Sequence, residues 1–321
     1  MKHILRMAMC SLLFVACTQD DITIENEVTN TNTEQKINES MLVFESQDQL
    51  KEFIAYRLES KTDLLEEART DFEEKERLSL LVVYNSLEKE EAEQLKLNRE
   101  EIAKVDSPDS MLLYLLNANG EIQIEDKIFR IDGDFVYTYT PGYGKKIDEF
   151  KEAYMRGDIR IEDGKTISYG ENLTVYKHMN RKQQEIAAKS TTEEIHEFNG
   201  RRARMIARQW NGHWAFYSSI GSVTKTQEWS QVLWWSQWKD VKTDNRLEFT
   251  ASWYAKDFFE VSPRIKSKSS HNYCNCYEAI DVYDWSAGLI AAEFTPRSGV
   301  TKHWSHWYQA TPNTVGTWIY Y

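Results

Sequence analysis

The chain has 321 residues, of which 41% are hydrophobic and 28% are charged, and its formal net charge is −12. This length and composition are typical of a folded protein with room for two cores of ordinary domain size. The negative charge argues against nucleic acid as a partner, because proteins that bind nucleic acid present a basic surface.

The first 16 residues have the pattern of a bacterial signal peptide that ends at a lipidated cysteine. A short basic start precedes a mainly apolar run over residues 7–15, and the small Ala16 stands directly before Cys17. The run is too short for a bilayer span, which needs about 20 apolar residues. We therefore expect removal of residues 1–16, acylation of Cys17 and attachment to a membrane through the lipid. Secretion with a free mature terminus is the alternative.

Residues 17–40 are expected to form a disordered tether, because Asn, Thr, Glu and Asp dominate this stretch. Asp20 and Asp21 follow the cysteine closely. This arrangement resembles the export signal of surface-exposed lipoproteins of Bacteroidetes-type bacteria. The resemblance implies an outer-membrane lipoprotein displayed on the cell surface, and a solvated linker is the plainer alternative.

Residues 41–195 alternate helical and strand patterns, which favours a small α+β domain. Ser46 and Gln49 have the spacing of a capping box at the start of a helix. Apolar residues recur at helical spacing and predict helices over residues 50–58, 64–72 and 148–155. Alternation at period two predicts strands at residues 121–124 and 128–131, beside the turn sequences Asn119-Gly120 and Asp132-Gly133.

Residues 196–321 differ in kind from the residues before them. All 11 tryptophans lie in this part of the chain, so we place a domain boundary near residue 195. Short alternating runs are broken by turn sequences such as Asn211-Gly212 and Thr243-Asp244-Asn245. Two predicted strand faces consist of Trp214, Phe216, Ser218 and Ile220, and of Leu247, Phe249, Ala251 and Trp253. The pattern indicates an antiparallel β-sandwich after the α+β domain, and therefore an α+β chain overall.

Two groups of residues carry a family resemblance. The first is the segment 115–124 followed by 128–131, and the second is Arg202, Trp210, Trp214, Tyr217, Ser219, Gly221 and Thr224. Both are similar to elements of uncharacterised Bacteroidetes-type surface lipoproteins that join an α+β N-terminal part to a Trp-rich β C-terminal domain. The resemblance implies the two-part layout and an envelope location, and it transfers no active site.

A cluster of indoles is the candidate ligand site, and its members are Trp229, Trp234, Trp235 and Trp238. Flat aromatic faces suit the stacking of sugar rings, and exposed aromatic patches tend to mark interaction sites. The alternative is that these indoles fill the β core, because tryptophan is mostly buried in folded domains. In a strand, adjacent Trp234 and Trp235 point to opposite faces, so at least one is exposed or capped.

A cysteine pair offers a second candidate site. Cys274, Cys276 and His271 provide three metal ligands, which His303 and His306 would complete. Paired zinc-binding cysteines are usually separated by two to four residues, and here the separation is one. A disulfide is the rival, but an extended strand holds these Cβ atoms about 6.6 Å apart, beyond the roughly 4 Å that a disulfide requires. We therefore expect two reduced, packed thiols and neither a metal nor a cofactor.

Three further motifs have plain explanations. The basic cluster of Arg201, Arg202, Arg204 and Arg208 fits a solvated strand face, or a patch for an anionic sugar or acidic partner. Asp132-Gly133-Asp134 fits a hairpin turn better than a calcium site. Asp109-Ser110-Met111 resembles the short acceptor sequence for O-linked glycans in the same bacteria.

Catalytic motifs do not identify a reaction, since neither a Gly-x-Ser-x-Gly elbow nor a His-Glu-x-x-His helix occurs. We therefore expect a non-catalytic surface module that binds a glycan or a surface protein. An envelope hydrolase acting on carbohydrate and a structural component of an envelope or fimbrial assembly are the alternatives.

Overall fold

The computed structural model describes residues 40–60, 63–85, 89–95, 97, 102–178, 191–198, 201–232, 235–257, 260–288, 291–306 and 314–320. These residues all fall in one compact unit. The predicted signal peptide, Cys17 and nearly all of the tether lie outside them. Strands dominate and almost all strand pairs are antiparallel, so the prediction of a β-rich α+β chain is confirmed. Among the described residues, no helix combines the length and the apolar character that crossing a bilayer requires.

The helices and strands have the following bounds. The helices are α2 (Gln47–Ser60), α3 (Leu64–Lys75), α4 (Leu80–Asn85), α5 (Lys89–Gln94), α6 (Ser110–Leu115) and α7 (Lys145–Arg156). The strands of the first sheet are β1 (Val43–Phe44), β2 (Glu121–Ile124), β3 (Lys127–Asp132), β4 (Phe135–Tyr139), β5 (Thr166–Ser168) and β6 (Leu173–Lys177). The later strands are β7 (Thr191–Phe198), β8 (Arg201–His213), β9 (Tyr217–Val232), β10 (Trp235–Asp240), β11 (Thr243–Lys256), β12 (Arg264–Cys276), β13 (Glu278–Ala287), β14 (Glu293–His306) and β15 (Thr314–Tyr320).

The three predicted helices are present as α2, α3 and α7. At the start of α2 the backbone N–H of Gln49 donates to Ser46 Oγ at 3.2 Å, as the capping-box pattern predicts. Leu50 and Ile54 of α2 are buried, which matches their helical spacing. Helices α4, α5 and α6 were not predicted, because a helix of six residues is too short to show a period.

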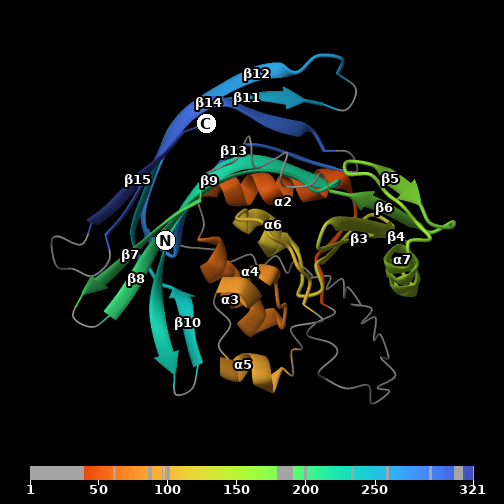
Figure 1. The fold of residues 1–321 in the computed structure, drawn as a ribbon, viewed down its shortest axis with the longest axis horizontal. Coiled ribbons are helices and arrows are strands. Elements are labelled where there is room, and N and C mark those ends of the chain that lie inside the picture. Colours follow the sequence, from red (N-terminus) through yellow and green to blue (C-terminus); the bar gives the residue numbers. More distant parts are fainter. Residues whose placement is uncertain are drawn as a thin grey trace, which may run out of the picture. The chain divides into compact units, whose positions relative to one another are not determined.

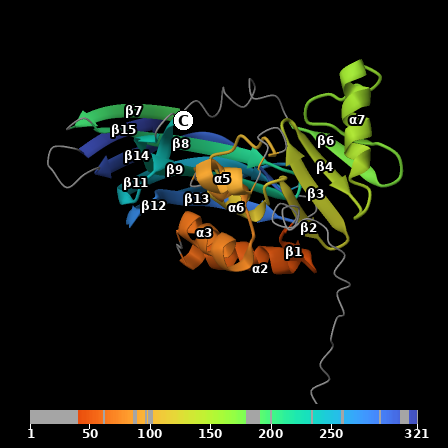
Figure 2. The same cartoon turned by 90° about the horizontal axis from the view of Figure 1, so that it is seen from below.

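The first sheet has the strand order β1-β2-β3-β4-β6-β5, and the predicted strands 121–124 and 128–131 are its β2 and β3. Helices α2, α3, α4 and α6 share a core with one face of this sheet, and α7 packs against the other face (Figure 2). Gly133 lies in the β3–β4 hairpin, so the turn predicted there is confirmed. Asn119-Gly120 precedes β2 instead of joining two strands, and Glu125 with φ +57° lies in the β2–β3 turn.

Two antiparallel sheets follow. One has the order β10-β9-β8-β7, with β13 also paired to β9, and the other has the order β12-β11-β14-β15 (Figure 1). Their buried side chains contact each other, since the rings of Phe249 on β11 and Tyr283 on β13 stack with centroids 3.9 Å apart. Helix α2 packs against β13.

The strand-face prediction is confirmed for β11, and for β9 it is wrong for two of its four residues. Leu247, Phe249, Ala251 and Trp253 are all buried on one face of β11. Trp214 and Phe216 are buried too, but they lie in the turn between β8 and β9, where Ala215 has φ +61°. The turns predicted at Asn211-Gly212 and Thr243-Asp244-Asn245 are wrong, because both segments lie inside strands.

One hydrophobic core crosses the boundary predicted near residue 195. It joins the apolar faces of α2, α3, α4 and α6 to Trp214, Phe216, Tyr217 and Ala287. The rings of Phe129 on β3 and Phe216 lie 5.2 Å apart within it. The two halves of the described chain therefore depend on shared buried surface, and the domain division stays a prediction.

Candidate functional site

The predicted indole cluster is only partly within the described residues. Trp229 and Trp238 are directly opposite in the β9–β10 pairing, with ring centroids 5.1 Å apart and an angle of 68° between the ring planes. Both are half-buried. Trp234 lies outside the described residues, and Trp235 is placed only as a backbone partner of Val232.

Arginines of the predicted basic cluster lie over these two indoles. The guanidinium of Arg204 is 4.5 Å from the Trp238 ring centroid, and that of Arg202 is 5.8 Å from the centroids of both rings. Arg204 Nε also donates to Gln227 Oε1 at 2.7 Å. At 4.5 Å, the Arg204 guanidinium covers part of the Trp238 ring face that a sugar would need. Ligand contact by Trp229, Trp234, Trp235 and Trp238 stays a prediction.

A different face of the molecule carries hollows. Alternation along β11 buries Asn245 and Leu247 and turns Asp244, Arg246 and Glu248 to the opposite, outer face of the β12-β11-β14 sheet. The pairing register of β11 with β12 and β14 determines which side chains lie next to them on that face. Arg246 is paired with Tyr273 of β12 and Trp304 of β14, and Glu248 is paired with His271 and Lys302.

Two pockets open on this outer face, and we name them the first and second outer pockets. The first has a volume of about 290 Å³ and is lined by Asp244, Arg246, Glu248, Tyr273, Trp304 and His306, among others. The second has a volume of about 280 Å³ and is lined by Glu248, Thr250, Ser269, His271, Val300 and Lys302, among others. Glu248 lines both pockets, so they are neighbours along β11.

Ion pairs and hydrogen bonds hold the polar side chains of the first outer pocket in place. Arg246 Nη2 lies 2.7 Å from Asp244 Oδ2, and this bond raises the pKa of Arg246. The guanidinium carbon of Arg246 is 5.7 Å from the centroid of the Tyr273 ring. Tyr273 donates its phenolic O–H to Glu248, which raises the pKa of Tyr273, and Lys302 Nζ is 3.7 Å from the other oxygen of Glu248. The pocket therefore presents an ordered set of donors and acceptors beside aromatic rings.

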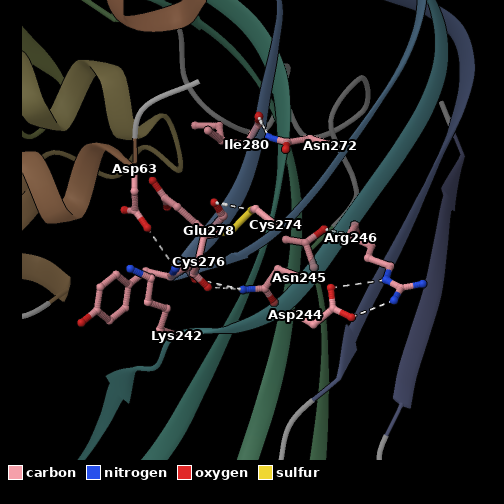
Figure 3. Close-up of a disulfide and its surroundings, with 12 residues drawn as sticks. Asp63, Lys242, Asp244, Asn245, Arg246, Asn272, Cys274, Cys276, Glu278 and Ile280 are labelled. Atoms are coloured by element: carbon pink, nitrogen blue, oxygen red, sulfur yellow. Dashed lines mark hydrogen bonds and ion pairs between the residues drawn. A yellow bond between two sulfur atoms is a disulfide. The ribbon is translucent and has the colours of Figure 1, made fainter. Parts of the chain in front are cut away.

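The cysteine pair lies behind this face, and the prediction of reduced thiols is wrong. Cys274 and Cys276 form a disulfide, with Cα atoms 5.3 Å apart. The prediction assumed a fully extended strand, whereas β12 ends at Cys276 and the chain turns into β13. Asn245 Nδ2 donates to the carbonyl oxygen of Cys276 at 2.9 Å, and Figure 3 shows Arg246 pointing away from the disulfide. The disulfide thus lies on the inner face where β12 ends beside the start of β11. The outer face of the same strand ends forms the first outer pocket.

The candidate metal ligands are not brought together. His271 lies on the outer face of β12 and Cys274 on the inner face, as their odd separation requires. His306 lines the first outer pocket, while His303 is fully buried between the sheets. Within the described ranges, no three His, Cys, Asp or Glu side chains are grouped so that they could hold a metal ion.

His303 belongs to a buried polar layer that the sequence did not predict. Its Nδ1 lies 2.8 Å from Thr224 Oγ1, and its Nε2 lies 2.9 Å from Thr301 Oγ1. Burial lowers the pKa of His303 to about 3, so the ring is neutral at physiological pH. The contact with Thr224 of β9 joins His303 of β14 to the other sheet, and the three side chains are fully buried.

Glu278 is a second buried titratable group, at the start of β13. Burial raises the pKa of Glu278 to about 7, against the opposing effects of the Lys225 charge and of a hydrogen bond with Ser110. Lys225 in turn lies 2.6 Å from Asn85 Oδ1 and 3.2 Å from Asp240 Oδ2. These contacts join α4 and α6 to β9, β10 and β13.

The other motifs are structural. Asp109 caps α6, accepts from the backbone N–H of Met111 at 3.0 Å and accepts from the Ser219 hydroxyl of β9. Ser110 is 3% exposed, so the resemblance of 109–111 to a glycan acceptor does not give an accessible acceptor in the folded protein. Asp132-Gly133-Asp134 lies at the β3–β4 hairpin turn, and Asp132 Oδ2 accepts from Lys151 Nζ at 2.6 Å.

No protein-family model, curated protein or solved structure matches this chain.

Proposed function

We propose that this chain is a non-catalytic, lipid-anchored surface protein of a bacterial envelope that binds glycan through the two outer pockets. The observation that carries the binding proposal is the row Tyr273–Arg246–Trp304, in which an arginine is flanked by two aromatic residues across three paired strands. Indole and phenol rings offer apolar faces to the C–H faces of sugar rings. Asp244 and Glu248 beside them offer acceptors for hydroxyl groups.

The anchoring part of the proposal rests on the signal-like residues 1–16, on Cys17 and on the resemblance to Bacteroidetes-type surface lipoproteins. We also propose that the two later sheets form the predicted β-sandwich. Buried contacts between β8, β9 and β13 on one side and β11 and β14 on the other support it. An acyl-modified Cys17 at the start of the native polypeptide, measured by mass spectrometry, is the expected result, and an unmodified chain that keeps Met1 contradicts the anchor.

Binding is preferred to hydrolysis because the carboxylates of the outer pockets are already held by cations and a phenol. Asp244 is paired with Arg246, and Glu248 with Lys302 and Tyr273. Ser222 and Lys225 have the spacing of a Ser-x-x-Lys nucleophile motif, but on β9 an odd separation places them on opposite faces. No observation favours the hydrolase over a binding module.

Replacing Trp304 with alanine tests the proposal. Trp304 is half-buried on the outer face, and loss of a central aromatic contact is expected to weaken glycan binding about tenfold or more, with little change in thermal stability. Retention of the protein on an array of neutral and acidic polysaccharides measures the effect.

Trp229→Ala is the matched control, because Trp229 is also a half-buried indole but lies in the β9–β10 hairpin. It should leave retention unchanged. Absence of retention of the parent protein on every polysaccharide, or loss of retention in Trp229→Ala alone, contradicts the assignment to the outer pockets.

A further inference from the structure

The two outer pockets follow one another along a single strand. The first is built around Asp244, Arg246 and Glu248, and the second begins at the same Glu248 and continues to Thr250. Residues 246 and 250 are four positions apart, which corresponds to about 13 Å along a strand. The hollowed surface is therefore elongated parallel to β11 rather than across the sheet.

The pockets have nearly equal volumes but different linings. Aromatic side chains flank the first, at Tyr273 and Trp304. The second offers hydroxyl groups at Thr250 and Ser269, whose oxygens lie 3.1 Å apart, and the aliphatic Val300. The first is thus suited to stack a ring, and the second is suited to hydrogen-bond a ring that lies next to it.

The charges of the two pockets balance. Arg246 and Lys302 are matched by Asp244 and Glu248, and each cation lies within 3.7 Å of a carboxylate oxygen. The arginine and the lysine of these linings therefore leave no excess positive charge to attract an anionic sugar. A ligand with hydroxyl groups and no net charge fits this arrangement best, because hydroxyls can both donate to carboxylates and accept from the cations.

We infer that the two outer pockets are consecutive subsites for a linear, neutral oligosaccharide that lies along β11 and spans at least two rings. One sugar ring stacks in the first pocket and its neighbour occupies the second. Glu248 accepts hydrogen bonds from hydroxyl groups of both rings. This inference rests on the proposed glycan-binding function and adds the length, direction and charge of the ligand.

Calorimetric titration with cello-, malto-, manno- and xylo-oligosaccharides of one to six rings tests the inference on the full chain. For the series that binds, affinity should rise at least tenfold between one ring and three and then level off. The affinity should change little between low and high salt, because a neutral ligand has no charge to screen. Equal affinity for one ring and for six, or a steep loss of affinity with salt, overturns the inference.

Ser269→Tyr isolates the second pocket. Ser269 is exposed on β12, where tyrosine is well tolerated in a strand, and the larger side chain should fill the pocket and remove the gain from the second ring. Single-ring binding should persist. Ser267→Tyr is the matched control, because Ser267 is also exposed and stands one row further along the same face, outside both pocket linings.

The outcomes separate the two proposals. Glycan binding that keeps its length dependence in Ser269→Tyr, or that loses it equally in Ser267→Tyr, overturns the two-subsite inference and leaves the glycan-binding function standing. Failure of every oligosaccharide and every arrayed polysaccharide to bind the parent protein overturns the function itself.

Discussion

Replacing Phe216 with alanine is expected to lower the free energy of unfolding by about 3–5 kcal/mol, as for other fully buried aromatic residues. Phe216 is completely buried, and its ring lies 5.2 Å from that of Phe129 in the core that joins the helices to the later strands. The side chain has no polar atom and contacts no pocket, so the loss reflects packing alone. Urea unfolding measures it.

Two optical signals follow different parts of the chain in this experiment. All 11 tryptophans lie at or after Trp210, whereas every helix among the described residues ends by Arg156. Fluorescence therefore reports the later strands and, through Trp214, their side of the shared core, and the far-ultraviolet helical signal reports the earlier part. Because the core is shared, Phe216→Ala should shift both transitions to the same lower urea concentration.

Tyr56→Ala is the control for this experiment, because Tyr56 is an aromatic residue of α2 that is 69% exposed. It should change the free energy of unfolding by no more than about 0.5 kcal/mol. If residue 195 separated two independently folding domains, Phe216→Ala would shift the fluorescence transition and leave the helical transition in place. That result would contradict the shared core.

Replacing Glu278 with glutamine is expected to make the protein more stable at pH 8 and to leave its stability near pH 4.5 almost unchanged. The ordinary pKa of this carboxyl is 4.5, and burial raises it to about 7 in the folded protein. Between these two values the folded state keeps a proton that the unfolded state has lost. The free energy of unfolding therefore falls as the pH rises from 4.5 to 7, by on the order of 3 kcal/mol.

His303 acts in the opposite direction, so the comparison has to be made between variants. Its pKa falls from the ordinary 6.5 to about 3 on folding, and the unfolded state binds a proton first as the pH drops below 6.5. The contribution of His303 to the free energy of unfolding is therefore lost as the pH falls below 6.5. The difference between Glu278→Gln and the parent protein cancels this contribution, because both contain His303. Chemical denaturation from pH 4.5 to 8 should show a difference that grows with pH, and a constant difference contradicts the raised pKa of Glu278.

The sequence predicted those features that depend on neighbouring residues. The Ser46 cap of α2 and the buried face of β11 from Leu247 to Trp253 follow from local spacing, and both are confirmed. The residues that alternate with this buried face, such as Asp244, Arg246 and Glu248, form the outer face of β11. Composition predicts a turn at the polar start of β11, Thr243-Asp244-Asn245, because composition alone does not distinguish a turn from a strand with one solvated face.

The outer pockets themselves were beyond the reach of sequence reasoning. Arg246 meets Tyr273 and Trp304 only through the register of three strands, 27 and 58 positions along the chain. The high local density of indoles between Trp229 and Trp238 predicts a site there, whereas Trp304 is isolated from them in the sequence. The disulfide and the raised pKa of Glu278 were missed for a similar reason, since both depend on where the chain turns and on what packs over it.

The most direct test of glycan binding at the outer face follows the tryptophan side chains individually by nuclear magnetic resonance. Each indole N–H gives its own signal, which single substitutions assign, and a neutral tetrasaccharide from the series that binds is added stepwise. We expect the Trp304 signal to shift in a saturable manner while the signals of Trp229 and Trp238 stay in place. Saturable shifts at Trp229 and Trp238 with an unmoved Trp304 would contradict the account and return the binding site to the β9–β10 hairpin.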